Sequence, residues 1–485
     1  MAFRDLRDFI GLLEERGQLK RVRVPVSSEL EITAITDRIS KGPTEANVAL
    51  LFENVQGYDI PVLINAFGSE QRMAWALGSE HLGELTERME RLLSPDIPES
   101  LLGKLKRLGD FLDVARAQPH AVGKAPCQEV VETEKPSLAA LPILKCWPRD
   151  GGRYITLPLV ITKDPATGRR NVGMYRLQVY DERTLGMHWQ AHKGGREHQQ
   201  QSLRLGHKRL EVAIALGGDP ATIYSATAPL PQGIDEILFA GWLRGAGVEM
   251  VKCLTVNLEV PARAEIVLEG YVDLDEQRLE GPFGDHTGYY SLAGMYPVFH
   301  LTALTRRRDA IYPATVVGRP PMEDYWLGKA TERLFLPLLR LMLPDIVDIN
   351  MPAEGVFHNL VIVSMRKRYP GHARQIMYGL WGLGLMMLAK NIIVVDEGVN
   401  VHDLSEVAWR VTNNIDASRD LVVVEGPVDD LDHASLRASY GGKLGIDATA
   451  KGPMEGFSRE WPAEITMSEE VKRLVDGKWS QYGLG

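Results

Sequence analysis

The chain has 485 residues, of which 45% are hydrophobic and 25% charged, and its formal net charge is −9. This is the composition of a soluble globular protein, too long for a single hydrophobic core, so we expect about two or three domains. The acidic charge argues against a nucleic-acid partner, and three cysteines without a C-x-x-C spacing favour a reducing compartment, the cytoplasm.

Residues 1–115 predict a mixed α/β domain. The chain opens with a charged amphipathic pattern that has no apolar signal core, which predicts a helix and not a secretion signal. Helices are predicted at residues 3–16, 28–40 and 69–77, and strands at residues 21–26, 49–53 and 61–65. Residues 101–117 are polar and are predicted to form a helical connector.

The rest of the chain divides into a β-rich part and an alternating part. In residues 116–310, short strands are separated by turn sequences such as DPATG, which favours a barrel or sandwich over a parallel sheet. In residues 311–485, apolar runs at 359–365, 391–396 and 421–425 alternate with helical segments at 372–389 and 403–413. That alternation predicts a parallel sheet with crossover helices. The longest apolar run, within the first of these helices, is too short to span a membrane.

The sequence EGPFGDHTGYY at residues 280–290 is the strongest candidate for a catalytic site. It places Glu280 and Asp285 on either side of a Gly-Pro-Phe-Gly turn, in which glycine allows unusual backbone angles and proline fixes φ. Two acids folded toward each other can share a proton, which raises one pKa and creates a general acid near neutral pH. The alternative is a solvated surface turn, but the aromatic residues that follow argue against it.

A candidate metal site involves residues on either side of a predicted hairpin. If the hairpin is centred on residues 181–184, Asn171 and His192 become cross-strand neighbours. Glu249, an acid within an apolar strand, is the candidate third ligand. These ligand types suit Mn²⁺ or Mg²⁺, whereas the alternative is a histidine and an asparagine that are simply hydrogen-bonded.

Two cationic side chains are further candidates for binding. Arg176 lies on the same predicted strand as Asn171, either as a clamp for a carboxylate or as an exposed strand arginine. Lys443 lies in the glycine-rich sequence GGKLGIDAT, which predicts a loop able to approach a phosphate. The motifs GxGxxG, GxxxxGK[ST] and HExxH do not occur, which argues against dinucleotide, P-loop and zincin sites.

These motifs resemble the UbiD-type decarboxylases, which remove CO₂ from aromatic and α,β-unsaturated acids with prenylated FMN. The resemblance covers essentially the whole chain, from DLRDF and LLFENVQGY near the N-terminus to GIDAT near the C-terminus. It implies an α/β N-terminal domain (1–115), a central flavin-binding split β-barrel (116–310) and a C-terminal α/β domain (311–485). The last domain is implied to mediate assembly into a homodimer or homohexamer.

The resemblance also implies roles for individual residues. Arg176, Glu280 and Asp285 would form an acid–arginine–acid network in which Asp285 donates the proton. Asn171, His192 and Glu249 would bind Mn²⁺ (or Mg²⁺) beside the flavin phosphate, with K⁺ nearby. The implied flavin contacts are Thr156, Met174, Tyr175, Arg176, His188, Trp189, Gln190, Lys193, Gly194, Thr227, Ala228, Pro229 and Lys443. A separate flavin prenyltransferase would supply the cofactor.

The identity of the aromatic substrate is predicted from finer similarities. Asp285 stands where the quinone-pathway branch has aspartate and the cinnamic-acid decarboxylases have glutamate, which leaves more room beside the flavin. The segments TLGMHWQAHK, FAGWLRG and VEGPVDDLDHAS most resemble decarboxylases of the futalosine route to menaquinone, which act on a naphthoate-type intermediate. The alternatives are a 4-hydroxy-3-polyprenylbenzoate or another aromatic acid as substrate, an FMN-dependent oxidoreductase, and a non-catalytic flavin-binding protein.

Overall fold

The N-terminal region forms a small mixed sheet with helices around it. The computed structural model describes residues 2–93, 114–190, 193–231 and 233–483. The elements of this region are α1 (Leu6–Glu15), β1 (Leu19–Val22), α2 (Glu31–Ser40), β2 (Ala49–Phe52), β3 (Val62–Ile64), α3 (Glu70–Ala76) and α4 (Leu82–Leu93). The strand order is β1-β2-β3-β16, in which β16 (Tyr312–Pro313) returns from later in the chain and pairs parallel to β3. The helices and two of the strands expected here are confirmed, whereas the strand expected at 21–26 lies at Leu19–Val22. Most of the expected connector at 101–117 lies outside the described residues.

The central region is dominated by one antiparallel sheet. Its strands are β5 (Val130–Glu132), β6 (Tyr154–Ile155), β7 (Pro158–Lys163), β8 (Arg170–Gly173), β9 (Leu177–Val179), β10 (Thr184–Met187), β11 (Arg209–Leu216), β14 (Ile266–Glu280) and β15 (Gly294–Arg306). They are ordered β6-β9-β10-β15-β14-β11-β7-β8, with β5 paired to β15. Within the described strands, β6 and β8 end this path without pairing with each other, as expected for a split barrel.

Shorter elements surround this sheet. The helices are α6 (Gly194–Arg204), α7 (Pro220–Ser225) and α8 (Glu236–Arg244), and a separate small sheet contains β4 (His120–Ala121), β12 (Glu249–Lys252) and β13 (Glu259–Pro261). The 3₁₀ helices of the molecule are η1 (Thr44–Ala46), η2 (Pro126–Gln128), η3 (Leu138–Ala140), η4 (Ala353–Gly355), η5 (Gly384–Leu388), η6 (Pro453–Glu455) and η7 (Trp479–Tyr482).

The predicted hairpin is present but shorter than expected. Strands β9 and β10 pair from Leu185↔Val179 to Met187↔Leu177. Strand β8 does not continue this ladder, because it pairs with β7, where Asn171 lies opposite Thr162. Between β8 and β9 the chain turns away, and the Met174 N–H donates to the Ala226 carbonyl at 3.0 Å. The expected cross-strand placement of Asn171 is therefore wrong, and His192 lies outside the described residues.

The C-terminal region is an α/β unit with a mixed sheet. Its elements are α9 (Glu323–Met342), β17 (Ile346–Asn350), β18 (Leu360–Met365), α10 (His372–Trp381), β19 (Asn391–Asp396), α11 (Leu404–Asn414), β20 (Leu421–Pro427), β21 (Tyr440–Asp447) and α12 (Glu469–Lys478). The order is β17-β18-β19-β21-β20, with the three inner strands parallel and both edges antiparallel. The parallel sheet is thus confirmed at its centre, but β20 is antiparallel because a direct connection, without a crossover helix, joins it to β21. The helix expected at 372–389 ends at Trp381, and η5 follows it.

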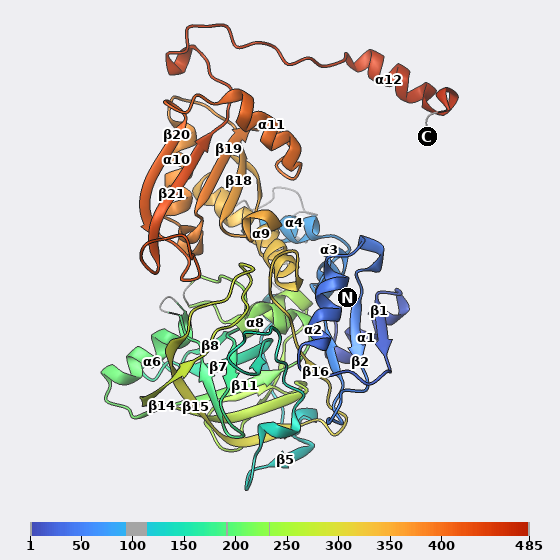
Figure 1. Ribbon diagram of the computed structural model, residues 1–485, viewed down its shortest axis with the longest axis vertical. Coiled ribbons are helices and arrows are strands. Elements are labelled where there is room, and N and C mark those ends of the chain that lie inside the picture. The colour runs from blue at the N-terminus through green and yellow to red at the C-terminus, as the bar shows by residue number, and fades with distance from the viewer. Residues whose placement is uncertain (1, 94–113, 191–192, 232, 484–485) are drawn as a thin grey trace.

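In Figure 1 the N-terminal region lies beside the central region, and the C-terminal sheet lies above both. Helix α9 leads from the central region to the C-terminal sheet and contacts α3 and α4 of the N-terminal region on the way. The segment that carries α12 extends away from the rest of the chain. Among the described helices, none combines the length and apolar character needed to cross a membrane.

Candidate active site

The turn that follows β14 is built by close packing. A Cβ on Gly284 would lie 2.2 Å from Cδ1 of Trp147, and a Cβ on Gly281 would lie 2.6 Å from Cα of Gly151. Neither glycine adopts a left-handed φ, and in this turn Gly288 does, at +81°. The expectation that Gly281 and Gly284 supply unusual backbone angles is therefore wrong, because these positions need glycine for the close approach of another segment.

The segment against which the turn packs also holds it by hydrogen bonds. The Gly284 N–H donates to Oδ1 of Asp150 at 2.8 Å, and the hydroxyl of Tyr154 donates to the Gly281 carbonyl at 3.0 Å. Oδ2 of Asp150 accepts in turn from the Trp147 N–H at 2.8 Å. The two acids at the ends of the turn are thus carried on a backbone fixed from outside the turn.

Arg176 lies between the two acids and contacts both. Its Nε donates to Oε1 of Glu280 at 2.9 Å, its Nη1 donates to Oδ2 of Asp285, and its Nη2 donates to the hydroxyl of Ser291 at 3.0 Å. The side chains of Arg176, Glu280 and Asp285 are only 9%, 1% and 8% exposed. The guanidinium also lies over the ring of Phe283, with its central carbon 4.9 Å from the ring centroid. The structure brings together the three residues that we expected to be catalytic.

The pKa that the structure indicates for Asp285 differs from the expectation for the two acids. Burial pushes the pKa of Asp285 upward, but the hydrogen bond and charge of His286 and the charge of Arg176 outweigh burial, so this pKa is lowered. The expected rise in the pKa of one acid is therefore not found at Asp285, because His286 and Arg176 both stabilise its carboxylate. In this arrangement Asp285 is ionised near neutral pH, and a neighbouring group must supply it with a proton before it can act as an acid.

A cavity of about 190 Å³ opens beside this network. It is lined by Thr156, Met174, Tyr175, Arg176, His188, Gln190, Lys193, Phe283, Asp285, His286, Val317 and Leu431. Seven of these residues are among the expected flavin contacts: Thr156, Met174, Tyr175, Arg176, His188, Gln190 and Lys193. Leu431 comes from the C-terminal region, which therefore forms part of the wall.

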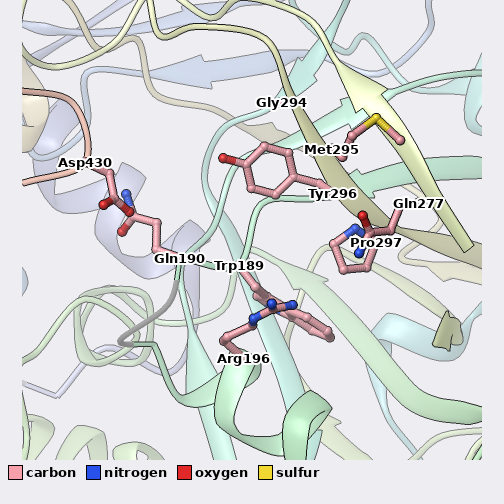
Figure 2. Close-up of a pocket in the computed structure, with 9 residues that line it drawn as sticks. All are labelled: Trp189, Gln190, Arg196, Gln277, Gly294, Met295, Tyr296, Pro297 and Asp430. Carbon is pink, nitrogen blue, oxygen red and sulfur yellow. The ribbon is translucent and has the colours of Figure 1, made fainter. Parts of the chain in front are cut away.

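A second cavity, of about 330 Å³, adjoins the first at Gln190. Trp189, another expected flavin contact, lines this cavity together with Arg196, residues of β14 and β15, and Asp430. Figure 2 shows the ring of Tyr296 pointing from β15 toward Gln190 and Asp430. The same ring lies against His188, with centroids 4.2 Å apart, so Tyr296 and His188 stand between the network and the second cavity.

At the start of α6, two glycines allow the close approach of side chains whose polar atoms have no partner in the described part of the chain. A Cβ on Gly194 would lie 2.0 Å from Oδ1 of Asn171, and a Cβ on Gly195 would lie 2.4 Å from Nε1 of Trp189. Nδ2 of Asn171 and Nε1 of Trp189 are buried without a hydrogen-bond partner among the described residues. An N-terminal helix end with two glycines and unpaired polar atoms fits the anionic end of a phosphate-bearing cofactor.

Glu236 is an acid in this neighbourhood that the sequence analysis missed. It is the first residue of α8, and its Oε2 accepts from the Val172 N–H at 3.1 Å, next to Asn171. Burial raises the pKa of Glu236 to about 7. The available signal was an acid directly before the apolar run ILFAGWL. A half-buried amide, a half-buried carboxylate and the start of α6 together fit a divalent cation that bridges to an anion.

Two expected contacts are corrected by the structure. Oε2 of Glu249 pairs with Nε of Arg263 at 2.6 Å, and Glu249 lies in the small β13-β12-β4 sheet, whereas Asn171 lies in the central sheet. Lys443 lies on β21, not in a loop, and its Nζ donates to the carbonyls of Met387 and Ala389. Neither Glu249 nor Lys443 is among the described residues that line the two cavities.

A further expected contact segment lies close to the cavities. Thr227, Ala228 and Pro229 directly follow Ala226, whose carbonyl accepts from the N–H of the lining residue Met174 at 3.0 Å. His192 lies outside the described residues. Within the described ranges, no group of three or more histidine, cysteine, aspartate or glutamate side chains is arranged to hold a metal.

Comparison with known proteins identifies a family. Models of the 3-octaprenyl-4-hydroxybenzoate carboxy-lyase (UbiD) family match consecutive segments of the chain. The N-terminal domain matches residues 10–92, the Rift-related domain residues 120–320 and the C-terminal domain residues 325–448. A protein of Archaeoglobus fulgidus, described as uncharacterized, is 55% identical over 482 residues, which cover 99% of each chain.

Solved structures agree with this match. The vanillic acid decarboxylase of Sedimentibacter hydroxybenzoicus is 28% identical over the full length of both chains, with a TM-score of 0.88 to its closed form and 0.81 to its open form. An evolved dimeric form of the UbiD-class enzyme HmfF from Pelotomaculum thermopropionicum, in complex with prFMN, is 28% identical. It covers 98% of this chain and 100% of its own, with a TM-score of 0.79. The chain therefore belongs to the UbiD family and is a carboxy-lyase.

Proposed function

We propose that the protein removes CO₂ from an aromatic carboxylic acid, without net oxidation, using prenylated FMN. The observation that carries this proposal is the buried Arg176–Glu280–Asp285 network on the wall of a cavity. Related enzymes of this fold act on vanillic acid and hold prFMN, which supports the substrate class and the cofactor. An electron-transfer reaction would leave the paired acids without a role, so the alternative of an oxidoreductase is disfavoured.

The network supplies the parts of a decarboxylation that a protein can supply. Loss of CO₂ from an aromatic ring leaves an electron pair that no side chain delocalises, and prenylated FMN supplies the electron sink when bound. Arg176 provides the positive charge that orients the substrate carboxylate. Glu280 holds Arg176 in place, and Asp285 delivers the proton to the carbon that lost CO₂.

The start of α6 and its surroundings form the proposed cofactor site. Asn171 and Glu236, with His192, would hold Mn²⁺ (or Mg²⁺) beside the flavin phosphate, and Glu236 replaces Glu249 in this role. K⁺ would be a second ion near the phosphate. The flavin contacts proposed are those of the sequence analysis without Lys443. A flavin prenyltransferase would supply the modified cofactor.

The substrate proposed is a naphthoate-type intermediate of menaquinone biosynthesis. The short side chain of Asp285 leaves space in the first cavity, and the second cavity of about 330 Å³, which adjoins it at Gln190, provides further room for a second ring. A 4-hydroxy-3-polyprenylbenzoate is the alternative, because the same cavity is open enough to admit a substituent on a benzoate ring.

The assembly proposed is a homodimer or homohexamer of a cytoplasmic enzyme, with domains at 1–115, 116–310 and 311–485. The segment around α12 supports self-association, because it extends from the body and exposes apolar side chains. Ile465 and Leu474, for example, are 101% and 54% exposed. A second copy of the chain would bury them.

The experiment that tests the proposed reaction is co-expression with a flavin prenyltransferase, followed by a panel of aromatic acids. Naphthoates, benzoates and polyprenylbenzoates are compared by CO₂ release and by H/D exchange at the ring carbon of the decarboxylated product. We expect turnover with naphthoates. Turnover of simple benzoates without any turnover of naphthoates would contradict the proposed substrate, and consumption of NAD(P)H without CO₂ release would contradict the reaction.

A further inference from the structure

Asp285 is the first member of a hydrogen-bonded chain that continues into the C-terminal region. Its Oδ1 accepts from Nδ1 of His286 at 2.8 Å, and Nε2 of His286 lies 2.9 Å from Nε2 of His358. His286 is 20% exposed, and Nδ1 of His358 is buried without a partner among the described residues. The sequence analysis assigned no role to either histidine.

The backbone that carries His358 is held in an unfavourable conformation. Val356 and Phe357, directly before it, have left-handed φ angles of +53° and +44°. A left-handed φ is unfavourable for both residues and most of all for the β-branched Val356, so it persists where the surrounding structure imposes it. Such residues cluster at functional sites, and here the outcome is the placement of His358 against His286.

The hydrogen bonds define which nitrogen carries a proton. Because the Asp285 carboxylate is an acceptor, Nδ1 of His286 carries a proton. Burial lowers the pKa of His286, but the hydrogen bond and charge of Asp285 outweigh it and the pKa is raised. Burial and the charge of His286 lower the pKa of His358 to about 4. His286 is therefore the imidazolium, and His358 is the neutral acceptor of its Nε2–H.

Other charged groups also face this pair. Those that face His286 are Asp285 on the turn, Asp324 at the start of α9 and Asp429 after β20, and those that face His358 are Asp285, Asp429 and Lys193. The acids around His286 favour its charged form, and Oδ2 of Asp324 is itself buried without a partner. The surroundings therefore keep a proton on His286 next to an ionised Asp285.

We propose that His286 transfers a proton to Asp285 in each turnover. We propose further that His358 is a positioning residue, whose hydrogen bond keeps the other proton of His286 on Nε2. This inference rests on the proposed decarboxylation. The Nδ1–H bond of His286 breaks as an O–H bond forms on Oδ1 of Asp285, which leaves a neutral imidazole whose Nε2–H still donates to His358. The new proton of Asp285 then goes to the substrate carbon, and His286 regains a proton at Nδ1 from water. One solvent proton is consumed for each CO₂ released, and no group is oxidised or reduced.

The position of His358 links this proton supply to the packing of two regions. His286 follows β14 of the central region, whereas His358 precedes β18 of the C-terminal region. The hydrogen bond between them exists only while these regions are docked as they are here. Docking therefore completes the proton supply as well as the cavity wall.

The first test measures the pKa of His286, and its dependence on His358, in the purified protein without cofactor. Deuterium exchange at the C2 position of histidine, followed by mass spectrometry across a pH series, reports the pKa of His286. We expect His358→Leu to lower this pKa, because the imidazolium loses its acceptor, and His358→Gln to restore it, because the amide oxygen reaches the same position. An unchanged pKa in His358→Leu, or no recovery in His358→Gln, would overturn the positioning role.

A matched control separates positioning from docking. The ring of His433 contacts Tyr289 at a centroid distance of 4.1 Å, which joins the same two regions without touching His286. We expect His433→Leu to leave the pKa of His286 unchanged. An equal drop in His433→Leu and His358→Leu would show that docking alone is responsible, and would also overturn the proposal.

The second test uses the enzyme loaded with cofactor. We expect His358→Leu to lower kcat about tenfold with KM unchanged, the scale of one lost hydrogen bond to a charged group, and His358→Gln to recover most of it. In the wild type, kcat should fall as pH rises through the raised pKa of His286. In His286→Asn, kcat should not fall over this pH range. Proton supply by His286 would be refuted if His358→Leu and His358→Gln changed KM by the same factor. It would also be refuted if kcat of His286→Asn still fell over the same pH range. Absence of CO₂ release from the wild type would instead refute the proposed reaction and leave the exchange result intact.

Discussion

Glu265 and Glu280 are both buried glutamates that bind arginine, and their surroundings differ. Glu265 is fully buried, and its oxygens accept from Arg7 Nε and Nη2 at 3.3 and 3.0 Å and from the Ile311 N–H at 2.9 Å. Arg307 lies beside Glu265 and donates onward to Asp5 at 2.9 Å. Glu280 is 1% exposed, and its Oε1 contacts both Arg176 and His188.

The difference lies in the atoms left without partners. Among the described residues, Asp5, Arg7, Glu265 and Arg307 have no unpaired buried side-chain atom, whereas Oε2 of Glu280 is unpaired. Around the cavities the unpaired atoms are Asn171 Nδ2, Trp189 Nε1, Glu280 Oε2, Asp324 Oδ2 and His358 Nδ1. Buried polar groups without partners are costly, and most of those in the described residues, such as the hydroxyl of Tyr312, lie away from the cavities. The Glu265 network is satisfied within the fold, whereas Glu280, in the network beside the cavity, keeps an oxygen without a protein partner.

The largest effect should come from Asp285→Asn. The amide cannot deliver a proton, so we expect kcat to fall by about 10²–10⁴, the usual contribution of a general acid, while flavin stays bound. Flavin absorbance and CO₂ release measure the two quantities on one sample. Undiminished CO₂ release would exclude Asp285 as the proton donor.

Glu265→Ala should have its effect on stability, in contrast to Glu280→Gln. Removing Glu265 leaves Arg7 and Arg307 without their shared partner, so we expect the free energy of unfolding to fall by about 3–5 kcal/mol. Denaturant unfolding measures this value, and kcat per folded molecule should not change. Glu280→Gln should instead lower kcat, because it loosens Arg176. If Glu265→Ala lowered kcat and Glu280→Gln lowered only the free energy of unfolding, the distinction between the two networks would be wrong.

Glu236→Gln and Glu249→Gln distinguish the two candidate metal ligands. Glu236 lies next to Asn171, so its loss should weaken metal binding by about 10- to 100-fold, the range for groups that support a metal site. Glu249 pairs with Arg263, and its substitution should leave metal and flavin content unchanged. Elemental analysis and flavin absorbance of the purified variants provide the measurement. If Glu249→Gln lost its metal and Glu236→Gln did not, Glu249 would be the metal ligand, as the sequence had suggested.

The smallest effect concerns the pH dependence of stability. The folded-state pKa of Asp285 is lowered, so its carboxylate contributes stability that is fully present above the unfolded value of about 3.9 and is lost as pH falls through the folded value. The difference in unfolding free energy between wild type and Asp285→Asn should therefore stay constant from neutral pH to about pH 5 and narrow below it. A difference that widens on acidification would contradict the lowered pKa.

Much of the architecture follows from local patterns. The expected helices and two of the three expected strands of the first 77 residues, the hairpin of β9 and β10 and the parallel centre of the C-terminal sheet are all present. These features depend on periodicity and turn residues within a few positions of one another. Strand β20 was misplaced because orientation depends on the connection to β21, which has no local signal.

The sequence alone singled out the turn at 280–290 with its two acids and, by resemblance, Arg176 as their partner. The tertiary structure decided the partners: Glu236 in place of Glu249 beside Asn171, Lys443 on a strand, and a lowered pKa at Asp285. His286 and His358 are 72 positions apart and belong to different regions, so no local pattern reports their contact. The sequence gives the type of each residue, whereas the charge, burial and hydrogen bonding of its side chain depend on which distant segments pack against it.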